Sequence, residues 1–369
     1  MNVVVTGGGT AGHVFPALAT ATALRDHHDA TIVFVGAEDG QEARLVPEAG
    51  FPFVPVHVSA AQARFSVATL RAVALALRGS RSVRGLVRGS DVVVSIGGFA
   101  SGPAALAARR TRRPLVLIEP NSVPGVVNRI AARWAAAVAT MFDGTSARLP
   151  GGVRVERTGN PIRTEIAAVP ERRARLRLEA CEAYGLEPDR ATVFVFGGSQ
   201  GALHLDQVVA EMLPALATRG DLQVLVSAGP GRDAEVARAV DPSAAVRVAV
   251  IPFIDRMDRA FALADLVVAR AGGSVAEVTA CGLPSILVPY PYATENHQEA
   301  NARELVAAGA ARMVLDRDLS SSTLATAILD LVDDPAAMAA MATSASAWAR
   351  PDAAQRIADL CVEVAGAAG

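Results

Sequence analysis

The sequence MNVVVTGGGTAGHVFPALA occupies residues 1–19 and sets a pattern that the rest of the chain repeats. A β-branched run at residues 2–6 ends in three glycines, and an apolar stretch follows that we expect to be helical from about residue 15. Glycines at a strand end let a ligand approach the backbone, and the next helix N-terminus supplies unpaired N–H groups. FGGSQGA at residues 196–202 has the same form. Glycines also serve packing alone in tight turns, but two such turns favour a ligand held by two domains.

Short apolar runs of this kind recur, each followed by an Ala-rich stretch with helical periodicity. The strands expected in the first half are residues 3–5, 31–35, 92–95, 115–118 and 137–139, and those in the second half are residues 192–196, 223–227, 246–250, 266–269 and 285–288. Alternating strands and helices predict parallel sheets, so the fold class is α/β with two Rossmann-like, doubly wound domains. A turn-rich tetrapeptide at residues 158–161 places the boundary between a domain of residues 1–160 and one of residues 161–344.

Composition excludes several classes of protein. The 369 residues are 51% hydrophobic and 20% charged, which excludes a disordered chain. All 35 basic residues are arginine and 37 acidic residues balance them, so we expect neither a nucleic-acid partner nor a catalytic lysine. Cys181, Cys281 and Cys361 are too widely spaced for a zinc ribbon. No apolar stretch approaches about 18 residues and no charged leader is present, so we expect a protein that is neither secreted nor membrane-spanning.

The densest polar cluster lies at residues 269–302. Glu277 falls in the first turn of an expected helix after a glycine turn, where a carboxylate can accept hydrogen bonds from two ribose hydroxyls or can merely favour the helix dipole. His297, Gln298 and Asn301 begin another helix, and together these residues favour a sugar nucleotide. A dinucleotide enzyme is the alternative, but the acid at the end of the second strand, Glu38, comes slightly late for it.

Seven motifs, in this order, resemble the MurG family of bacterial transferases. They are TGGGTAGHVFPALA (6–19), GGFASGPAALAA (97–108), EPNSVPGVVNR (119–129), TGNPIR (158–163), FGGSQGA (196–202), PFIDRM (252–257) and the cluster at residues 269–302. The resemblance implies a GT-B fold, with two Rossmann-like domains facing a cleft and a terminal helix at about residues 345–369 that packs back on the first domain. It also implies an inverting transferase that moves N-acetylglucosamine from UDP-N-acetylglucosamine to the C4 hydroxyl of undecaprenyl-pyrophosphoryl-N-acetylmuramyl-pentapeptide, converting lipid I into lipid II.

The resemblance also assigns residues to roles. The family's nucleotide contacts correspond to Ser199, Arg163 and Ile254, and its ribose carboxylate corresponds to Glu277. The pair that faces the sugar corresponds to His297 and Gln298, and the loop beside the donor corresponds to Thr10, Ala11 and Gly12. Asn121 matches an amide that holds the N-acetylglucosamine, and His13 matches the proposed base. A helix N-terminus keeps an imidazole neutral, which suits a base, although a His there can also cap the helix or bind phosphate.

Two departures from the family pattern keep alternatives open. Ile118 and Pro120 flank Glu119 where the family has His-Glu-x-Asn, and the glycine turn before Glu277 is one residue shorter than usual. A related GT-B enzyme acting on another lipid or a natural product, or a UDP-sugar epimerase, therefore stays possible. Asp316 and Asp318 have the spacing of a metal-binding pair, but they precede a serine run that indicates a helix entry, so we expect no metal cofactor.

A membrane partner is expected from residues 51–90, which contain no acid. In this stretch Arg64, Arg71, Arg78, Arg81, Arg84 and Arg88 alternate with Phe65, Leu70, Val73, Leu75, Leu77 and Leu86. A basic amphipathic helix can lie on an anionic membrane surface, or it can pack on a core with a solvated arginine face. With a lipid-linked acceptor, the first option predicts a peripheral protein at the cytoplasmic face of the plasma membrane, where other cell-wall synthesis proteins are possible partners.

Overall fold

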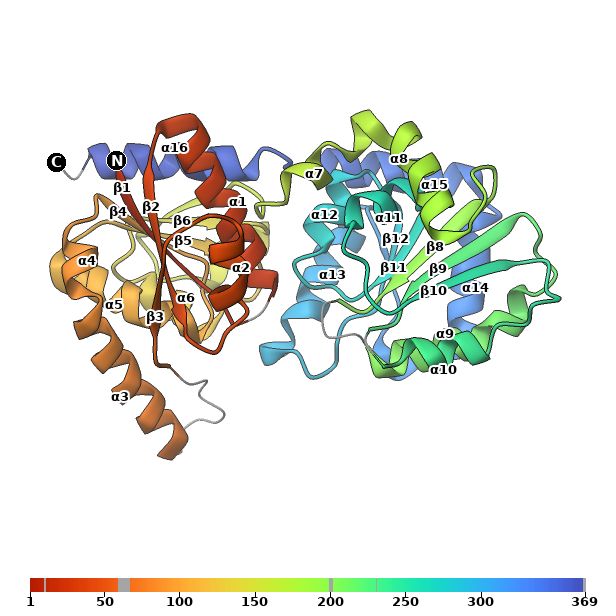
Figure 1. Ribbon diagram of the computed structural model, residues 1–369, viewed down its shortest axis with the longest axis horizontal. Coiled ribbons are helices and arrows are strands. Elements are labelled where there is room, and N and C mark those ends of the chain that lie inside the picture. The colour runs from red at the N-terminus through yellow and green to blue at the C-terminus, as the bar shows by residue number, and fades with distance from the viewer. Residues whose placement is uncertain (10, 59–66, 199–201, 230, 368–369) are drawn as a thin grey trace. The chain divides into compact units, whose positions relative to one another are not determined.

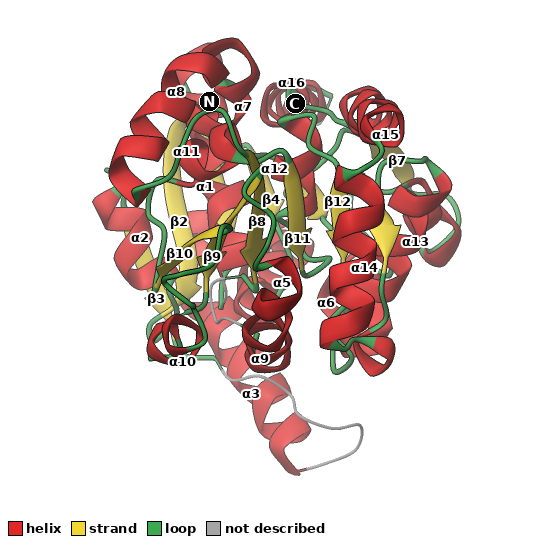
Figure 2. Ribbon diagram, turned by 90° about the vertical axis from the view of Figure 1, so that its right-hand side faces the viewer, coloured by secondary structure: helices red, strands yellow, loops and turns green. Residues whose placement is uncertain are grey.

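The computed structural model describes residues 1–9, 11–58, 67–198, 202–229 and 231–367 (Figure 1). The chain forms two compact units, one of Met1–Arg163 with Arg350–Gly369 and one of Thr164–Ala349. Each unit contains a parallel sheet covered by helices, as the ribbon coloured by secondary structure shows (Figure 2). The α/β class with two parallel-sheet domains is confirmed.

The sheet of the first unit has the strand order β3-β2-β1-β4-β5-β6-β7, with every neighbouring pair parallel. The strands are β1 (Asn2–Thr6), β2 (Thr31–Ala37), β3 (Phe53–Val56), β4 (Val92–Ser95), β5 (Leu115–Glu119), β6 (Ala137–Thr140) and β7 (Arg154–Arg157). Val5 pairs with Phe34 of β2 on one side and with Val94 of β4 on the other. The chain order therefore reverses at β1, and in such sheets ligands bind beyond the carboxyl ends of the strands at this point.

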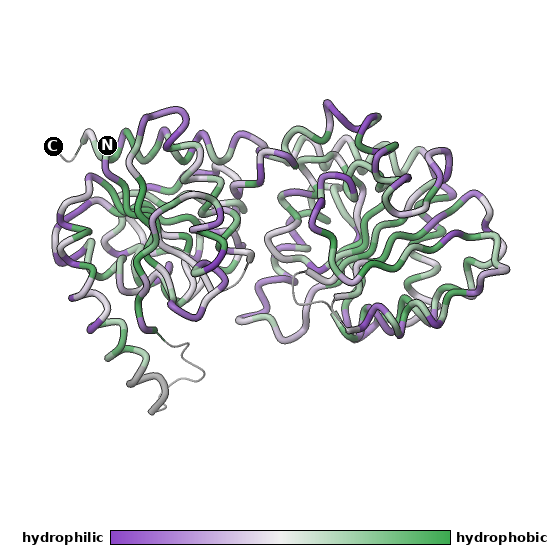
Figure 3. The backbone as a smooth tube through the Cα atoms, viewed as in Figure 1, coloured by the Kyte–Doolittle hydropathy of each residue, from purple (hydrophilic) through white to green (hydrophobic). Residues whose placement is uncertain are grey.

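Helices cover both faces of this sheet. They are α1 (Ala11–His28), α2 (Glu42–Glu48), α3 (Val67–Ser82), α4 (Arg84–Arg88), α5 (Gly102–Thr111), α6 (Val126–Ala131) and α16 (Ala353–Gly366), with 3-10 turns η1 (Phe99–Ser101) and η2 (Asp143–Arg148). Alternate residues of a strand face opposite sides, so Val3 and Val5 join the core under α1 and α16, whereas Val4 joins the core under α4 and α5. The apolar strands run through the middle of each unit in the hydropathy trace (Figure 3).

The terminal helix α16 completes the core of the first unit. Its residues Ile357, Leu360 and Cys361 are buried against α1 and the sheet. Gly159, which follows β7, has a φ of 89°, and a Cβ there would lie 2.5 Å from the Cβ of Arg350, the first residue of the segment that returns to the first unit. The segment that leaves the first unit and the segment that returns to it therefore touch at a position that only glycine fits.

The second unit repeats the topology, with the parallel order β10-β9-β8-β11-β12-β13. Its strands are β8 (Ala191–Phe196), β9 (Leu222–Ser227), β10 (Arg247–Ile251), β11 (Leu266–Ala269), β12 (Ser285–Leu287) and β13 (Arg312–Met313). Its helices are α7 (Thr164–Ala167), α8 (Val169–Tyr184), α9 (Leu203–Met212), α10 (Asp233–Arg238), α11 (Met257–Leu263), α12 (Val275–Ala280), α13 (His297–Ala307), α14 (Ser321–Val332) and α15 (Pro335–Trp348), with 3-10 turns η3 (Leu213–Leu216), η4 (Thr294–Asn296) and η5 (Asp316–Asp318). Here the order reverses at β8.

The ten expected strands are present, and three further strands were missed. The three missed strands, β3, β7 and β13, each lie at the edge of a sheet. An edge strand is less enclosed than a central one, so it does not need a continuous apolar run. β7 is the charged sequence RVER, and β13 has two residues. The helix expected from about residue 15 begins instead at Ala11 and contains Pro16, which has no N–H to donate to the Gly12 carbonyl. Among the described residues, no helix is long and apolar enough to cross a membrane.

Candidate functional site

The turn after β1 is packed tightly against the turn after β4. A Cβ at Gly98 would lie 2.8 Å from the Gly8 carbonyl oxygen, and one at Gly9 would lie 3.0 Å from the Phe99 ring. Gly98 and Gly9 also have φ values of 74° and 87°, which glycine alone adopts without strain. The two turns therefore meet at the carboxyl edge of the first sheet, at the point where the strand order reverses.

His13 lies beside these turns, in the first turn of α1. Its imidazole is half-buried, and a Cβ at Gly98 would lie 3.8 Å from both Nδ1 and Cε1 of the ring. Ala11 is the first residue of α1 and Gly12 is exposed, whereas Thr10 lies outside the described residues.

Glu119 ends β5 and organises the turn that carries Asn121. Its carboxylate, 2% exposed, accepts hydrogen bonds from the Asn121 backbone N–H at 3.0 Å, from the Gly125 N–H at 2.9 Å and from Asn128 Nδ2 at 3.0 Å. The Asn121 side-chain amide also donates to Glu119, at 3.3 Å. Burial raises the pKa of the Glu119 carboxyl to about 7, although these donors oppose the shift. Glu119 belongs to the sequence motif at residues 119–129, but the motif predicts no role for it.

Arg163 is the last residue of the first unit before the chain enters the second. The boundary expected after residue 160 would place it in the second domain. The Arg163 guanidinium lies over the ring of Phe15 in α1, with Cζ 4.9 Å from the ring centroid. The chain has not yet left the first sheet at this point, because the helices of the second unit begin with α7. A guanidinium stacked on an aromatic ring keeps its positive charge.

In the second unit, α13 holds the turn between β11 and α12. Gln298 accepts a hydrogen bond at Oε1 from the Tyr290 backbone N–H at 2.9 Å, which leaves its Nε2 on the side of Gly272. Asn301, fully buried, donates from Nδ2 to the Ala271 carbonyl at 3.0 Å. Glu277 follows this turn as the third residue of α12 and is half-buried. The structure therefore brings Glu277 and Gln298 to the same edge of the second sheet.

His297 is the first residue of α13, and its Nδ1 lies 2.8 Å from the Thr294 carbonyl oxygen. Since a carbonyl only accepts, Nδ1 carries the hydrogen and the Nε2 of a neutral ring is an acceptor. The two residues before it, Glu295 and Asn296, have φ values of 52° and 54°. Adjacent left-handed residues other than glycine are strained and occur mostly at functional sites.

Asp316 lies in η5 and is engaged by two side chains. Arg270, 7% exposed, forms an ion pair with it and donates to the Val288 carbonyl at 3.2 Å, and His204 Nδ1 lies 2.9 Å from its Oδ2. Ser320 then begins α14 with a capping box to Thr323. The aspartate pair thus stands in a 3-10 turn ahead of the helix cap, and no group of three His, Cys, Asp or Glu residues that could hold a metal occurs within the described ranges.

Two further predicted residues, Ile254 and Ser199, belong to the second unit. Ile254 is buried in the turn after β10, next to Phe253, which is exposed. Ser199 lies outside the described residues. The sequence motifs give no role to Glu42, Glu119 and Arg270. All three are charged groups at strand or helix ends, and their burial, which only the folded chain shows, is what marks them.

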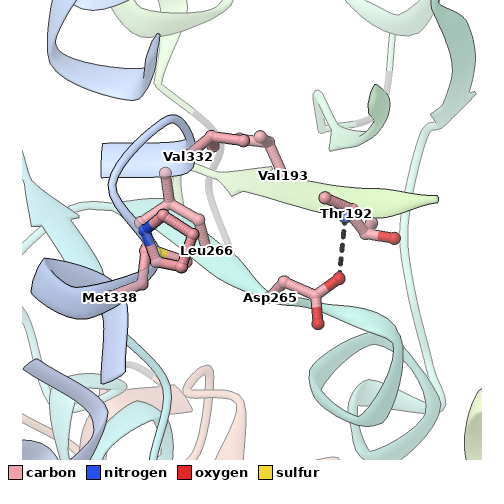
Figure 4. A pocket seen from close by; sticks show the side chains of 8 residues that line it. Thr192, Val193, Asp265, Leu266, Val332 and Met338 are labelled. Carbon is pink, nitrogen blue, oxygen red and sulfur yellow. Dashed lines mark hydrogen bonds between the residues drawn. The ribbon is translucent and has the colours of Figure 1, made fainter. Parts of the chain in front are cut away.

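A cavity of 220 Å³ lies at the opposite, amino-terminal edge of the second sheet (Figure 4). It is lined by residues that include Thr192, Leu266 and Met338. Asp265, its one charged lining group, accepts a hydrogen bond from the Thr192 backbone N–H at 2.9 Å and pairs with Arg173 and Arg177. This carboxylate is already used by the fold, so we assign no ligand to the cavity.

Comparison with known proteins defines the class. The profile of the glycosyltransferase family 28 N-terminal domain matches residues 3–140, and that of the C-terminal domain matches residues 192–357. Relatives named "UDP-N-acetylglucosamine--N-acetylmuramyl-(pentapeptide) pyrophosphoryl-undecaprenol N-acetylglucosamine transferase" include those of Nitrosococcus oceani, at 41% identity over 99% of both chains, and Halothermothrix orenii, at 37% identity over 99% of both chains. The chain belongs to this family of transferases, the MurG family.

Solved structures agree with this assignment. The crystal structure of Acinetobacter baumannii MurG has a TM-score of 0.78 and 27% identity, covering 98% of this chain and 99% of its own. A UDP-GlcNAc 2-epimerase from Neisseria meningitidis, at 13% identity and a TM-score of 0.70 over 98% of this chain and 100% of its own, shares the fold alone.

The buried Glu119 makes stability depend on pH. Its pKa is about 7 in the folded protein against an ordinary 4.5, so between these values the folded state binds more protons and stability rises as pH falls. Relative to Glu119→Gln, the wild type should gain up to about 1.4 kcal/mol of unfolding free energy per pH unit from pH 7 to pH 5. Urea unfolding across this range, with the exposed Glu48→Gln as control, checks it. If the unfolding free energies of the wild type and Glu119→Gln changed in parallel with pH, the raised pKa of Glu119 would be contradicted.

Proposed function

We propose that this chain transfers N-acetylglucosamine from UDP-N-acetylglucosamine to the C4 hydroxyl of undecaprenyl-pyrophosphoryl-N-acetylmuramyl-pentapeptide, with inversion at the sugar. The names of the relatives support the substrates, and they cover nearly the full chain. One observation about the two sheets carries the proposal. The strand order reverses at β1 in the first sheet and at β8 in the second, and a glycine turn follows each of these strands. The candidate residues follow strands at the carboxyl edges of the same two sheets.

The reaction requires a donor site for the nucleotide and the sugar. In the proposed site Glu277 accepts hydrogen bonds from the ribose hydroxyls, and Ile254 and Ser199 contact the nucleotide. Gln298 has its oxygen committed to Tyr290, so its Nε2 is the group left to donate to a sugar hydroxyl. His297 offers the opposite function, because its Nε2 accepts.

The chemical step is a direct displacement. The acceptor C4 oxygen attacks the anomeric carbon of the donor sugar, the bond from that carbon to the UDP oxygen breaks, and UDP leaves with the electron pair. In the proposed mechanism His13 takes the proton of the C4 hydroxyl, and Asn121 holds the N-acetylglucosamine. The charge that develops on UDP meets Arg163 and the N-terminal amides of α9. Thr10 and the first two residues of α1, Ala11 and Gly12, are the residues beside the donor in this proposal.

The proposed reaction needs no metal ion. Arginine and helix N-termini can stabilise a leaving pyrophosphate without one. The Asp-x-Asp sequence offers a poor alternative, since Asp316 is already held by Arg270 and His204.

One assay decides between this proposal and its competitors. The pure protein is incubated with UDP-N-acetylglucosamine and the lipid-linked muramyl pentapeptide, with and without EDTA, and the products are separated. A disaccharide lipid in both samples is the expected result. A change in the free sugar nucleotide would favour an epimerase. Transfer of the sugar only to a different acceptor would favour a related transferase. Loss of the product when EDTA is present would overturn metal independence.

The proposed ribose contact predicts a loss of donor affinity. Glu277→Ala removes a charged hydrogen-bond acceptor, so UDP binding should weaken by about 1.5 to 3 kcal/mol. Isothermal titration with UDP measures this, and Glu211→Ala, an exposed glutamate in α9, should bind as the wild type does. Unchanged affinity in a folded Glu277→Ala protein would remove this residue from the ribose.

The proposed base predicts a different pattern. His13→Ala should lower turnover by about 10² to 10⁴-fold while UDP affinity stays within about twofold, because the imidazole acts on the acceptor. Steady-state kinetics and UDP titration separate the two effects. His27→Ala, exposed in the last turn of the same helix, is the control. A wild-type rate for His13→Ala would leave the histidine a structural role.

We also propose that the first unit binds an anionic membrane surface through the basic surface of Arg78, Arg81, Arg84 and Arg88, which are exposed on α3 and α4. Val73, 53% exposed on α3, adds an apolar contact. Gly79 instead packs near Pro103 of α5, so one side of α3 is bound to its own unit. This surface would hold the protein at the cytoplasmic face of the plasma membrane, where the lipid-linked acceptor lies.

The basic surface predicts salt-sensitive vesicle binding, because each arginine near an anionic surface contributes about 1 kcal/mol and salt screens it over about 8 Å. Replacing Arg78, Arg81 and Arg84 by glutamate should release the protein from vesicles that contain anionic lipid. The matched control replaces the exposed Arg172, Arg238 and Arg317 of the second unit, with the same change in net charge. Sedimentation at low salt gives the answer, and equal pelleting of the two triple variants would contradict this surface.

A further inference from the structure

Glu42 is a buried carboxylate that joins two strand ends. It is the first residue of α2 and is 1% exposed. Its Oε2 accepts a hydrogen bond from the Gly9 backbone N–H at 2.9 Å, and its Oε1 accepts one from the Ala37 N–H at 2.9 Å. Gly9 belongs to the turn after β1, and Ala37 is the last residue of β2. One side chain thus fixes the glycine turn relative to the neighbouring strand.

Three glycines form the space that this carboxylate occupies. A Cβ at Gly8 would overlap Oε1, a Cβ at Gly40 would overlap Oε2, and a Cβ at Gly36 would lie 2.6 Å from Cγ. Gly36 and Gly40 have backbone angles outside the left-handed region. Room for Glu42, and not an unusual backbone angle, therefore requires glycine at these two positions.

The glycine turn is held from both sides. Gly98 and Phe99 pack against one side of it, and Glu42 binds its amide from the other. Gly9 is only two residues before α1 begins, and His13 lies in the first turn of that helix. A shift of the Gly9 amide would therefore move the start of α1, and displacement of a reacting group by about 1 Å can cost 10²-fold in rate.

We propose that Glu42 is a positioning residue for glycosyl transfer, whose carboxylate holds the Gly7–Gly9 turn so that α1 presents His13 to the acceptor hydroxyl. This inference rests on the proposed function, with His13 as the base. Glu42 itself touches no substrate in this scheme, because both of its oxygens are bound to backbone amides.

Glu42→Gln is the first test, because the amide has the same shape but only one accepting oxygen, so one of the two backbone N–H groups loses its partner. We expect kcat to fall about 10 to 100-fold while KM for UDP-N-acetylglucosamine and UDP affinity stay within about twofold. Glu48→Gln, exposed at the end of the same helix, is the control. A wild-type kcat in Glu42→Gln would overturn the proposal.

A double-mutant cycle with His13→Ala separates positioning from general destabilisation. If Glu42 acts through the imidazole, Glu42→Gln should have no further effect on the rate once His13 is alanine. A loss of the same size in both backgrounds would show that Glu42 supports only the fold. Gly40→Ala, which would displace the carboxylate from the other side, provides a second variant with the same expected pattern if Glu42→Gln does not fold.

A measurement without substrate distinguishes failure of this inference from failure of the proposed function. In Glu42→Gln, amide hydrogen exchange of a peptide covering residues 7–14 should become at least about tenfold faster than in the wild type and in Glu48→Gln. Unchanged exchange would overturn the positioning role whatever reaction the protein catalyses. If exchange becomes faster in Glu42→Gln but the wild type forms no disaccharide lipid, Glu42 still holds the glycine turn and the proposed transfer reaction fails.

Discussion

Close approach of backbone to backbone at the carboxyl edge of the first sheet is the constraint on which the candidate site depends. The Gly8 carbonyl lies where any side chain at Gly98 would have to go, so the turns after β1 and β4 can meet only as glycine turns. This contact sits where the strand order reverses, and it brings the start of α1 beside the turn after β4. Buried carboxylates at Glu42 and Glu119 then fix the neighbouring turns by accepting backbone N–H groups.

The second unit reaches a comparable arrangement by other means. Here side-chain amides hold the turns: Gln298 accepts from the backbone of its own preceding loop, and Asn301 donates to the turn after β11. Arg270 links the end of β12 to η5 through Val288 and Asp316. The two units thus share a topology while fixing their turns with different chemistry, carboxylates in one and amides with a buried guanidinium in the other.

The strands at the centre of each sheet could be predicted from the sequence because they are buried on both faces. Residues 92–94 and 266–269 are continuous apolar runs, and they lie in β4 (Val92–Ser95) and β11 (Leu266–Ala269). The edge strand β3 has the short apolar sequence FVPV with Pro55 inside it, and the edge strand β7 is the charged sequence RVER, whose hydrophobicity does not separate it from a loop. The limit is physical, since an edge strand is defined by its neighbour's hydrogen bonds more than by its own side chains.

For the candidate site, sequence motifs indicated the turns but not what holds them. The glycine-rich turns were expected, and the structure places His13, Glu277 and Gln298 next to such turns; the roles of these residues stay predictions. Glu42 could not be found from spacing, because its pocket is formed by Gly8 in the turn after β1, Gly36 within β2 and Gly40 in the turn after β2. Only the folded chain shows that these glycines share one neighbour.

The path of the chain has a consequence for biosynthesis. Residues 164–349 form the second unit, yet the first unit is not finished until α16 adds Ile357 and Leu360 to its core. During translation, the apolar face that α16 will cover stays open while the whole second unit emerges from the ribosome. The usual order, in which the N-terminal domain matures first, is therefore reversed: the second unit can complete its fold earlier, and the nascent first unit depends on the last helix to seal it.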